Sequence, residues 1–325
     1  MKLQTQIPLS KESNNLINYE SKILLLGSCF VENIGNKLGY FKFQTLQNPF
    51  GILFHPKAIE TLILNAINKK KYSEADIFFH NEQWHCFDGH SKLNNTSKEV
   101  LLADLNEAIQ STNAQIRTST HIIITLGTAW IYRFLETNRI VANCHKIPQK
   151  QFKKELLSVE EITQSLRNIE QEIRKVNSKA SLIFTVSPVR HLKDGFIENT
   201  QSKSHLITAI HQLLNQKSSI VNRQSFYFPS YEIMMDELRD YRFYADDLIH
   251  PNNVAINYIW EKFQEVWMSS KTIQIMEEVD VIQKGLLHKP FNPESESHRK
   301  FLRNLENQKQ QIQSKFPFLS ILTKN

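Results

Sequence analysis

Residues 23–30 read Ile-Leu-Leu-Leu-Gly-Ser-Cys-Phe, four aliphatic residues followed by a glycine-serine turn. A short apolar run that ends at a turn is typical of a strand buried on both faces of a parallel sheet. Residues 31–38 then place apolar side chains at helical spacing. Strand, turn and helix in this order predict the start of an α/β fold with a parallel sheet.

Three further runs of the same kind predict buried strands at 121–126, 181–186 and 225–228. Helical stripes with a 3.6-residue period lie between the strands and predict core-facing helices. The stripes are Leu101, Leu105, Ala108 and Ile109; Ile162, Leu166, Ile169, Ile173 and Val176; and Leu206, Ile210, Leu213 and Leu214. Residues 78–88 and 130–144 break the alternation, and we expect them to form β-hairpin or loop insertions.

The chain becomes purely helical in pattern after Trp267. An apolar stripe recurs through 275–286, and a polar helix is expected from 294 to 314. We therefore expect one α/β domain over residues 1–268, and a helical extension over 269–325 that packs on the same domain.

Composition describes a globular chain of 325 residues, 41% apolar and 22% charged, with only 8 glycines. The net charge of +6 comes without a dense basic run, so no nucleic-acid partner is indicated. Three cysteines are too few for a disulfide framework, and the odd count indicates a reducing compartment. Residues 1–15 lack the apolar core of a signal peptide, and no run is long enough to span a membrane. We expect a cytoplasmic protein, and the oligomeric state stays open.

Ser28 is the first candidate for chemistry, because it follows the first predicted strand directly. Ligands of open α/β sheets bind outside the carboxyl ends of the strands. A serine at that turn exposes its hydroxyl in the crevice, with its N–H near a helix N-terminus that favours negative charge. The alternative is an ordinary helix cap.

Asp247-Leu248-Ile249-His250-Pro251, late in the chain, is the second candidate. A serine needs a neighbouring base to become a nucleophile, and imidazole titrates near neutrality. An aspartate three residues before the histidine can orient its ring, and the following proline restrains the turn. The alternative is a structural turn before the helix that begins near Asn252.

Gly51 and Gly127 each lie in a loop after a predicted strand. Glycine lets the backbone approach a ligand closely, so both loops are suitable places for oxyanion-hole donors. Ordinary turns are the alternative for both.

These blocks together resemble the SGNH (GDSL-like) hydrolases and, more specifically, the GSCFA family, over about residues 20–268. The defining stretch is Gly27-Ser28-Cys29-Phe30-Val31. The other matching blocks are Asn48-Pro49-Phe50-Gly51, Leu126-Gly127-Thr128-Ala129-Trp130, Asn143-Cys144-His145-Lys146, Ser187-Pro188-Val189-Arg190-His191 and Asp247-Leu248-Ile249-His250-Pro251.

The resemblance implies a flavodoxin-like three-layer α/β/α fold and ester or acyl chemistry. It implies Ser28 as nucleophile, His250 as base, Asp247 as the orienting acid and Gly51 as an oxyanion donor. The superfamily usually carries an asparagine two residues after the glycine of its third block, where this chain has Ala129. Thr128, Asn143 and Asn48 are the candidates to replace that donor.

Several further residues lie at or beyond predicted strand ends. His145, Arg190 and His191, together with Asn48, are candidates for binding the substrate, and the basic ones either hold an anionic group or pair with local carboxylates. Cys29 is expected to be a buried neighbour of the nucleophile rather than the nucleophile itself.

The histidines of the first insertion are His80, His85 and His90, accompanied by Cys86. Their spacing matches no common zinc signature, and we expect surface histidines and no metal site.

We expect a serine-dependent esterase or acyl hydrolase that acts on a small-molecule or glycan acyl ester, with no metal or organic cofactor. In this scheme, the backbone N–H groups of Ser28 and Gly51 stabilise the oxyanion. The alternatives are an acyltransferase with the same triad, and a non-catalytic binding module that retains the fold.

Overall fold

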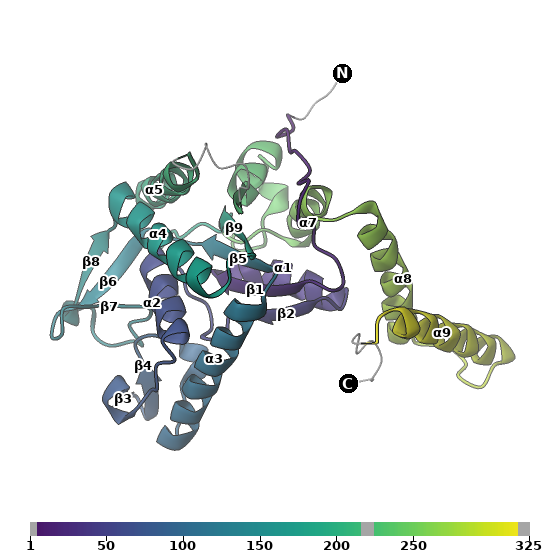
Figure 1. Cartoon of the computed structure of the whole chain (residues 1–325), viewed down its shortest axis with the longest axis horizontal. Helices are drawn as coiled ribbons and strands as arrows, with labels where there is room; N and C mark the ends of the chain where they lie inside the picture. Colours follow the sequence, from purple (N-terminus) through teal and green to yellow (C-terminus); the bar gives the residue numbers. More distant parts are fainter. Residues whose placement is uncertain (1–4, 216–223, 318–325) are drawn as a thin grey trace.

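The computed structural model describes residues 5–215 and 224–317, so the last residues of the predicted extension, 318–325, lie outside it. Its centre is a five-stranded parallel sheet in the order β10-β9-β5-β1-β2 (Figure 1). The strands are β1 (Lys22–Gly27), β2 (Gln44–Gln47), β5 (His121–Leu126), β9 (Ser181–Val186) and β10 (Ser225–Phe228).

All four strands with predicted bounds are confirmed. The edge strand β2 is the strand expected before the Gly51 loop, and the sequence gives it no bounds because Gln-Thr-Leu-Gln contains no apolar run. Every residue of β2 is only partly buried, as expected of an edge strand.

Helices cover both faces of the sheet, which makes the three-layer α/β/α fold that the sequence predicts. The longer helices of the body are α1 (Cys29–Tyr40), α2 (Pro56–Ile67), α3 (Lys98–Thr118), α4 (Val159–Val176), α5 (Phe196–Asn215) and α7 (Asn253–Trp267). Short helical turns are η1 (Glu74–Asp76), η2 (Ser91–Leu93), η3 (Gln149–Gln151), α6 (Ser230–Glu232), η4 (Ile233–Glu237) and η5 (Tyr241–Phe243).

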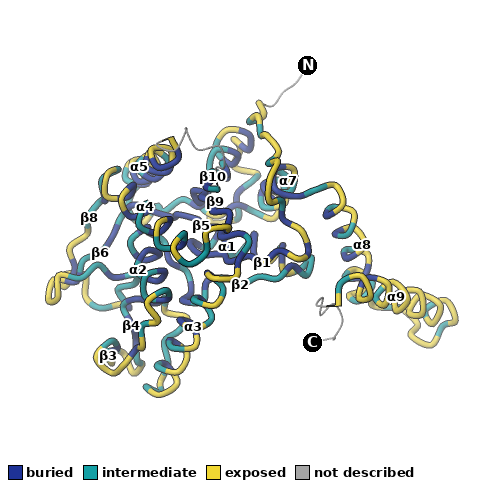
Figure 2. Tube along the Cα trace, in the orientation of Figure 1, coloured by how far each residue is buried: buried dark blue, intermediate teal, exposed yellow. Residues whose placement is uncertain are grey.

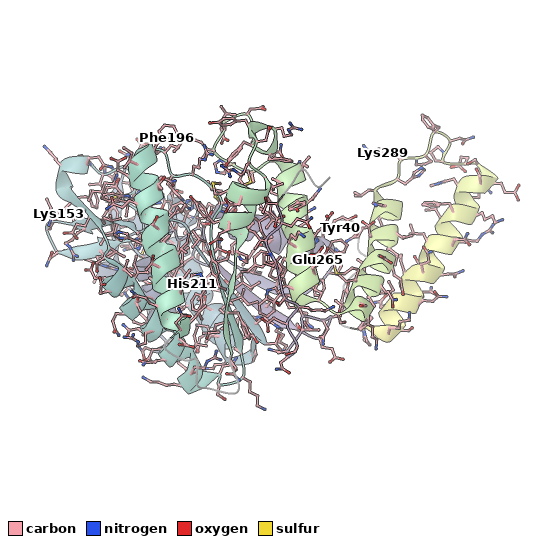
Figure 3. The ribbon with its side chains drawn as sticks, turned by 90° about the horizontal axis from the view of Figure 1, so that it is seen from above. Tyr40, Lys153, Phe196, His211, Glu265 and Lys289 are labelled. Atoms are coloured by element: carbon pink, nitrogen blue, oxygen red, sulfur yellow. The ribbon has the colours of Figure 1, made fainter. Side chains whose placement is uncertain are left out.

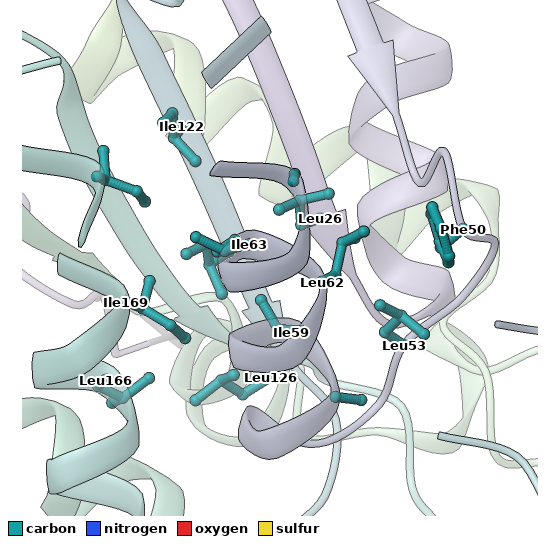
Figure 4. Close-up of a cluster of buried hydrophobic side chains, with 14 of the residues drawn as sticks. Leu26, Phe50, Leu53, Ile59, Leu62, Ile63, Ile122, Leu126, Leu166 and Ile169 are labelled. Atoms are coloured by element: carbon teal, nitrogen blue, oxygen red, sulfur yellow. The ribbon is translucent and has the colours of Figure 1, made fainter. Parts of the chain in front are cut away.

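Alternate residues of each strand face opposite layers, since the side-chain period of a strand is two. Leu24 and Leu26 of β1 pack with α2, α3, α4 and α5, in the cluster shown in Figure 4. Ile23 and Leu25 pack on the other side with α1 and α7. Both layers are thus buried, which explains the continuous apolar runs of the inner strands.

Two insertions interrupt the alternation of strands and helices, as the sequence predicts. The first is the antiparallel hairpin β3 (Ile77–His80) and β4 (Gln83–Cys86). The second is an antiparallel sheet of β6 (Trp130–Phe134), β7 (Arg139–Val141) and β8 (Phe152–Leu156). Strand β8 was not expected, because its central Lys-Lys-Glu is polar.

The C-terminal helices α8 (Ser270–Leu287) and α9 (Glu296–Lys315) pack on each other beside the body (Figures 1 and 3). The Tyr40 hydroxyl of α1 donates to Asp280 at 2.8 Å, and Gln283 Nε2 donates to the Tyr40 carbonyl at 2.9 Å. Met276 and Val279 join the same apolar cluster as α1 and α7. Much of α9 faces solvent (Figure 2).

The topology places a switch point beside β1. The chain passes from β1 to the edge strand β2, and then returns across β1 to β5 on the other side. Ligands of doubly wound sheets bind at such points, outside the carboxyl ends of the strands. The turn that follows β1 therefore lies where a site is expected.

No helix in 5–215 or 224–317 combines the length and the apolar character needed to cross a membrane.

His55 links helix α2 to the second insertion. It caps α2 by accepting the Ala58 N–H at Nδ1 over 3.1 Å, and its Nε2 lies 3.1 Å from the Val141 carbonyl. Because the Val141 carbonyl can only accept, Nε2 must carry the ring proton. Nδ1 already accepts the Ala58 N–H, so it cannot take up a second proton, and the ring is neutral. Burial lowers the pKa of His55 to about 4.

We expect acid to destabilise the protein through His55. The unfolded chain takes up a proton near pH 6.5, whereas the folded chain does so only near pH 4. The contribution of neutral His55 to the free energy of unfolding is complete above pH 6.5 and is lost as the pH falls towards 4. Replacing His55→Asn, which keeps a capping oxygen, should reduce the slope of unfolding free energy against pH by up to about 1.4 kcal/mol per unit in this range.

Urea unfolding at several pH values measures this slope. His211→Asn, at an exposed position of α5, is the matched control and should leave the slope unchanged. An unchanged slope in His55→Asn would contradict the assignment.

Candidate functional site

Backbone hydrogen bonds hold the turn between β1 and α1 in place. Gly27 has φ +134°, and a Cβ there would collide with the Thr125 carbonyl of β5, so only glycine fits. The Gly27 N–H donates to Asn48 Oδ1 at 2.9 Å, and the Ser28 N–H donates to the Thr125 carbonyl at 3.0 Å. Both N–H groups of the turn are thereby used to hold it against neighbouring loops.

Ser28 itself is the N-cap residue of α1, but its hydroxyl makes no capping bond. The side chain is fully buried, and Oγ has no hydrogen-bond partner in the structure. A buried, unpaired hydroxyl costs about 1–3 kcal/mol, so a serine in this state needs an explanation other than capping. The ordinary cap that the sequence left open as an alternative therefore does not describe Ser28.

Asp247 and His250 form a closed turn that presents the imidazole. Asp247 Oδ1 accepts the N–H groups of Ile249 and His250, both at 2.9 Å, and Oδ2 lies 2.6 Å from His250 Nδ1. The three bonds, led by those of the backbone N–H groups, lower the pKa of Asp247 to about 2. The carboxylate is thus ionised at neutral pH and fixes the ring through Nδ1.

The structure brings Asp247 and His250 together but leaves Ser28 without a hydrogen bond to either. About half of the His250 side chain is exposed, whereas Ser28 is fully buried. The Asp247–His250 turn is instead linked to the loop after β9, because the Arg190 N–H donates to the Ile249 carbonyl at 3.4 Å.

Of the expected oxyanion donors, the backbone groups are already engaged. The Gly51 N–H donates to the Asn48 carbonyl at 2.7 Å, and the Thr128 N–H donates to the Phe54 carbonyl at 3.2 Å. The Thr128 hydroxyl accepts the Trp130 N–H and contacts Ser202 Oγ, each at 3.1 Å.

The two asparagine candidates differ in their surroundings. Asn143 Oδ1 accepts the His145 N–H at 2.8 Å, so this side chain organises its own loop. Asn48 Nδ2 is buried and makes no hydrogen bond, while Oδ1 of the same amide holds Gly27. Asn48 therefore keeps an unused donor next to the serine turn.

Gly127 lies between Ser28 and His191. The place that a Cβ on Gly127 would occupy is 3.2 Å from Ser28 Cβ and 3.1 Å from His191 Nε2. The Phe54 carbonyl oxygen is also 3.2 Å from this point, so the absence of a side chain on Gly127 lets Ser28 and His191 lie close to each other. His191 Nε2 is buried and has no partner.

Lys203 of α5 supports this loop and was not identified from the sequence. It is almost fully buried, and its ammonium group donates to the carbonyls of Gly127 and Ser187, both at 2.7 Å. Burial lowers its pKa to about 7. The signal was present, because Lys203 precedes Leu206 and Ile210 on the apolar stripe of its helix.

Arg190 borders a pocket of about 200 Å³ together with Met234, Tyr241 and Tyr244. Its guanidinium lies 4.7 Å from the Tyr244 ring centre and donates to that hydroxyl at 2.9 Å. In the part of the chain that the structure describes, no carboxylate pairs with Arg190. Of the two roles expected from the sequence, pairing with a local carboxylate is not seen among the described residues, and binding of an anionic substrate group stays a prediction.

His145 lies elsewhere, between the two insertions. Its Nδ1 is 3.3 Å from His85 Nδ1, and its Nε2 is 2.8 Å from the Cys86 carbonyl. Burial lowers the pKa of His145 to about 4. The expectation of surface histidines is wrong for His85, which is 4% exposed because the second insertion covers the hairpin.

Within the described ranges, no three potential ligands gather to hold a metal ion. Cys29 is partly buried, and desolvation raises the pKa of its thiol.

Fold and site together define a doubly wound α/β protein with an unpaired serine at the topological switch point. The sequence model of the GSCFA family matches residues 22–263, and that of the GSCFA C-terminal domain matches residues 279–323. The chain belongs to the GSCFA family. No curated protein matches it.

We expect Lys203 to make stability depend on pH above neutrality. The unfolded chain keeps this proton up to about pH 10.5, whereas the folded chain releases it near pH 7. The unfolded state therefore holds more protons between these values, and stability should rise with pH by up to about 1.4 kcal/mol per unit.

Lys203→Met should remove this rise, as measured by urea unfolding between pH 7 and 10. Lys175→Met, an exposed lysine of α4, is the control that should preserve it. A rise of equal size in Lys203→Met would show that another group causes it.

Proposed function

We propose that the protein is a serine-dependent esterase or acyl hydrolase of the SGNH type. The observation that carries this proposal is the buried Ser28 hydroxyl, which neither caps its helix nor finds any partner at the switch point. A second, independent support is the Asp247–His250 pair, whose 2.6 Å contact is the geometry of an oriented general base.

In the proposed reaction, Ser28 Oγ bonds to the ester carbonyl carbon and passes its proton to His250 Nε2. Asp247 holds Nδ1–H and stabilises the imidazolium. His250 returns the proton to the leaving alcohol as the C–O bond breaks. Water then attacks the acyl-enzyme and gives a proton to His250, which restores it to Ser28 as the acid departs.

The oxyanion requires donors that are not otherwise bonded. Because the Ser28 and Gly51 N–H groups donate to backbone carbonyls, we assign Asn48 Nδ2 this role. The proposed proton transfer requires a hydrogen bond between Ser28 Oγ and His250 Nε2 in the substrate complex, and catalytic hydrogen bonds of this kind often tighten only when substrate binds.

The burial of Ser28 favours a second candidate, an acyltransferase with the same residues. A serine that is 0% exposed is sheltered from water, which would protect an acyl-enzyme until an alcohol or amine acceptor arrives. A nucleophilic acceptor added to the ester assay separates the two activities by their products.

We expect Ser28→Ala to lower kcat/KM for activated esters of varied acyl length by about 10⁴-fold or more, because the nucleophile is lost. His250→Ala should have a comparable effect, and the double variant should be no worse than either single one, because the residues act as a unit. Initial-rate kinetics measure all three.

Cys29→Ala is the matched control for Ser28→Ala, since it alters the adjacent side chain, and it should retain turnover. Equal turnover by wild type and Ser28→Ala would overturn the mechanism. Fluorophosphonate labelling of Ser28 that persists undiminished in His250→Ala would exclude His250 as the base. A protein that binds esters without any Ser28-dependent turnover would be a binding module.

A further inference from the structure

His191 lies beside Ser28. Its buried Nε2 and Ser28 Cβ are both close to the point that a Cβ on Gly127 would occupy, at 3.1 and 3.2 Å. Neither His191 Nε2 nor Ser28 Oγ has a hydrogen-bond partner, so both are available to a ligand that reacts at Ser28. A group of this kind is suited to contact a reacting carbonyl rather than a remote part of the substrate.

The backbone of His191 is held by two hydrogen bonds and its ring by one aromatic contact. The backbone N–H donates to Asn199 Oδ1 at 2.9 Å, and the backbone carbonyl accepts the Asp194 N–H at 3.2 Å. The ring lies edge-on to Phe54, with 5.5 Å between the centroids. A donor that is fixed before the reaction is more effective than one that must reorganise.

His191 is neutral under ordinary conditions. Burial, followed by the nearby charges of Lys203 and His250, lowers its pKa to about 3. A base with so low a pKa takes a proton poorly at neutral pH, so His191 is a weak candidate for the general base. A neutral imidazole still donates one hydrogen bond, and can do so to a developing oxyanion.

The position that would supply a third donor in SGNH hydrolases is unsuitable in this chain. Ala129 is fully buried in the cluster shared with α2–α5, and its N–H donates to Ser202 Oγ at 2.7 Å. A donor to the oxyanion must therefore come from another loop, and the loop after β9 carries His191.

We propose that neutral His191, through Nε2–H, donates a hydrogen bond to the oxyanion that forms at Ser28, in the place left without a donor by Ala129. This assignment rests on the proposed function of Ser28. It makes His191 a catalytic residue that contacts the reacting oxygen, with Asn48 Nδ2 as the other side-chain donor.

Two substitutions separate a donor from a structural residue. His191→Gln can place an amide N–H near the position of Nε2, whereas His191→Asn reaches only the position of Nδ1. We expect His191→Asn to lower kcat by about 10²–10³-fold with little change in KM, and His191→Gln to recover much of that loss. Equal losses in both variants, matched by equal losses of melting temperature, would overturn the donor role.

Gly127→Ala tests the shared space without replacing a polar side chain. Gly127 has no left-handed φ, so alanine is compatible with its backbone, but the methyl would lie between His191 Nε2 and Ser28. Turnover should fall at least as far as in His191→Asn, with the fold retained by circular dichroism. Undiminished turnover would show that no oxyanion occupies this space.

The ring itself gives a readout that does not depend on activity. Nitrogen-15 spectra of the imidazole should show Nε2–H in neutral His191 at pH 6, and this resonance should shift when phenylboronic acid forms an adduct with Ser28. An Nδ1–H tautomer, an imidazolium at pH 6, or an adduct that leaves Nε2–H unshifted would overturn the proposal.

The outcomes also distinguish this proposal from the proposed function. Wild-type turnover equal to that of Ser28→Ala would mean that the function of Ser28 is wrong. Ser28-dependent turnover that survives in His191→Asn would mean that only the role of His191 is wrong. Turnover lost in His191→Asn but retained in His250→Ala would make His191 the base, which also contradicts the donor role.

Discussion

The close approach of β1 to β5 at Gly27 is the constraint on which the rest of the site depends. The two backbones are too close there to leave room for a Cβ. The Gly27 N–H donates to the Asn48 side chain, and the Ser28 N–H donates to the Thr125 carbonyl. The turn is therefore rigid although its serine makes no bond of its own. Backbone hydrogen bonds stabilise the turn, and the Ser28 hydroxyl has no partner at the point where the strand order reverses.

Lys203 holds the loops after two neighbouring strands, β5 and β9, in a similar way. By holding the carbonyls of Gly127 and Ser187 it joins the loops after β5 and β9, and the second of these leads to His191. Burying a lysine without a carboxylate partner opposes folding, which the apolar layers on both faces of the sheet offset. Three buried polar atoms without a hydrogen-bond partner, on Ser28, Asn48 and His191, thus lie in the loops at this edge of the sheet, and unpaired polar groups of this kind are frequent at functional sites.

The sequence predicted those elements whose character is local. Continuous apolar runs identified β1, β5, β9 and β10, and helical stripes identified the layers that cover them. The sequence provided no bounds for β2 and missed β8, because their pairing with β1 and β6 is stabilised by the neighbouring strand and not by an apolar pattern of their own. It also missed the burial of His85, because the covering insertion lies some 60 residues further along the chain.

For the site, the sequence by itself determined which side chains follow which strands, and hence that Ser28, Gly127 and His191 share the carboxyl edge of a parallel sheet. It also determined the Asp247–His250 pair, because three residues of one tight turn suffice to form it. Only the tertiary structure decided which donors remain free. Hydrogen bonds between distant loops engage the N–H groups of Thr128 and Ser28, while the Gly51 N–H is engaged within its own turn by Asn48. Asn48 Nδ2 and His191 Nε2 stay unpaired, and which donors stay unpaired depends on distances between loops that no local pattern encodes.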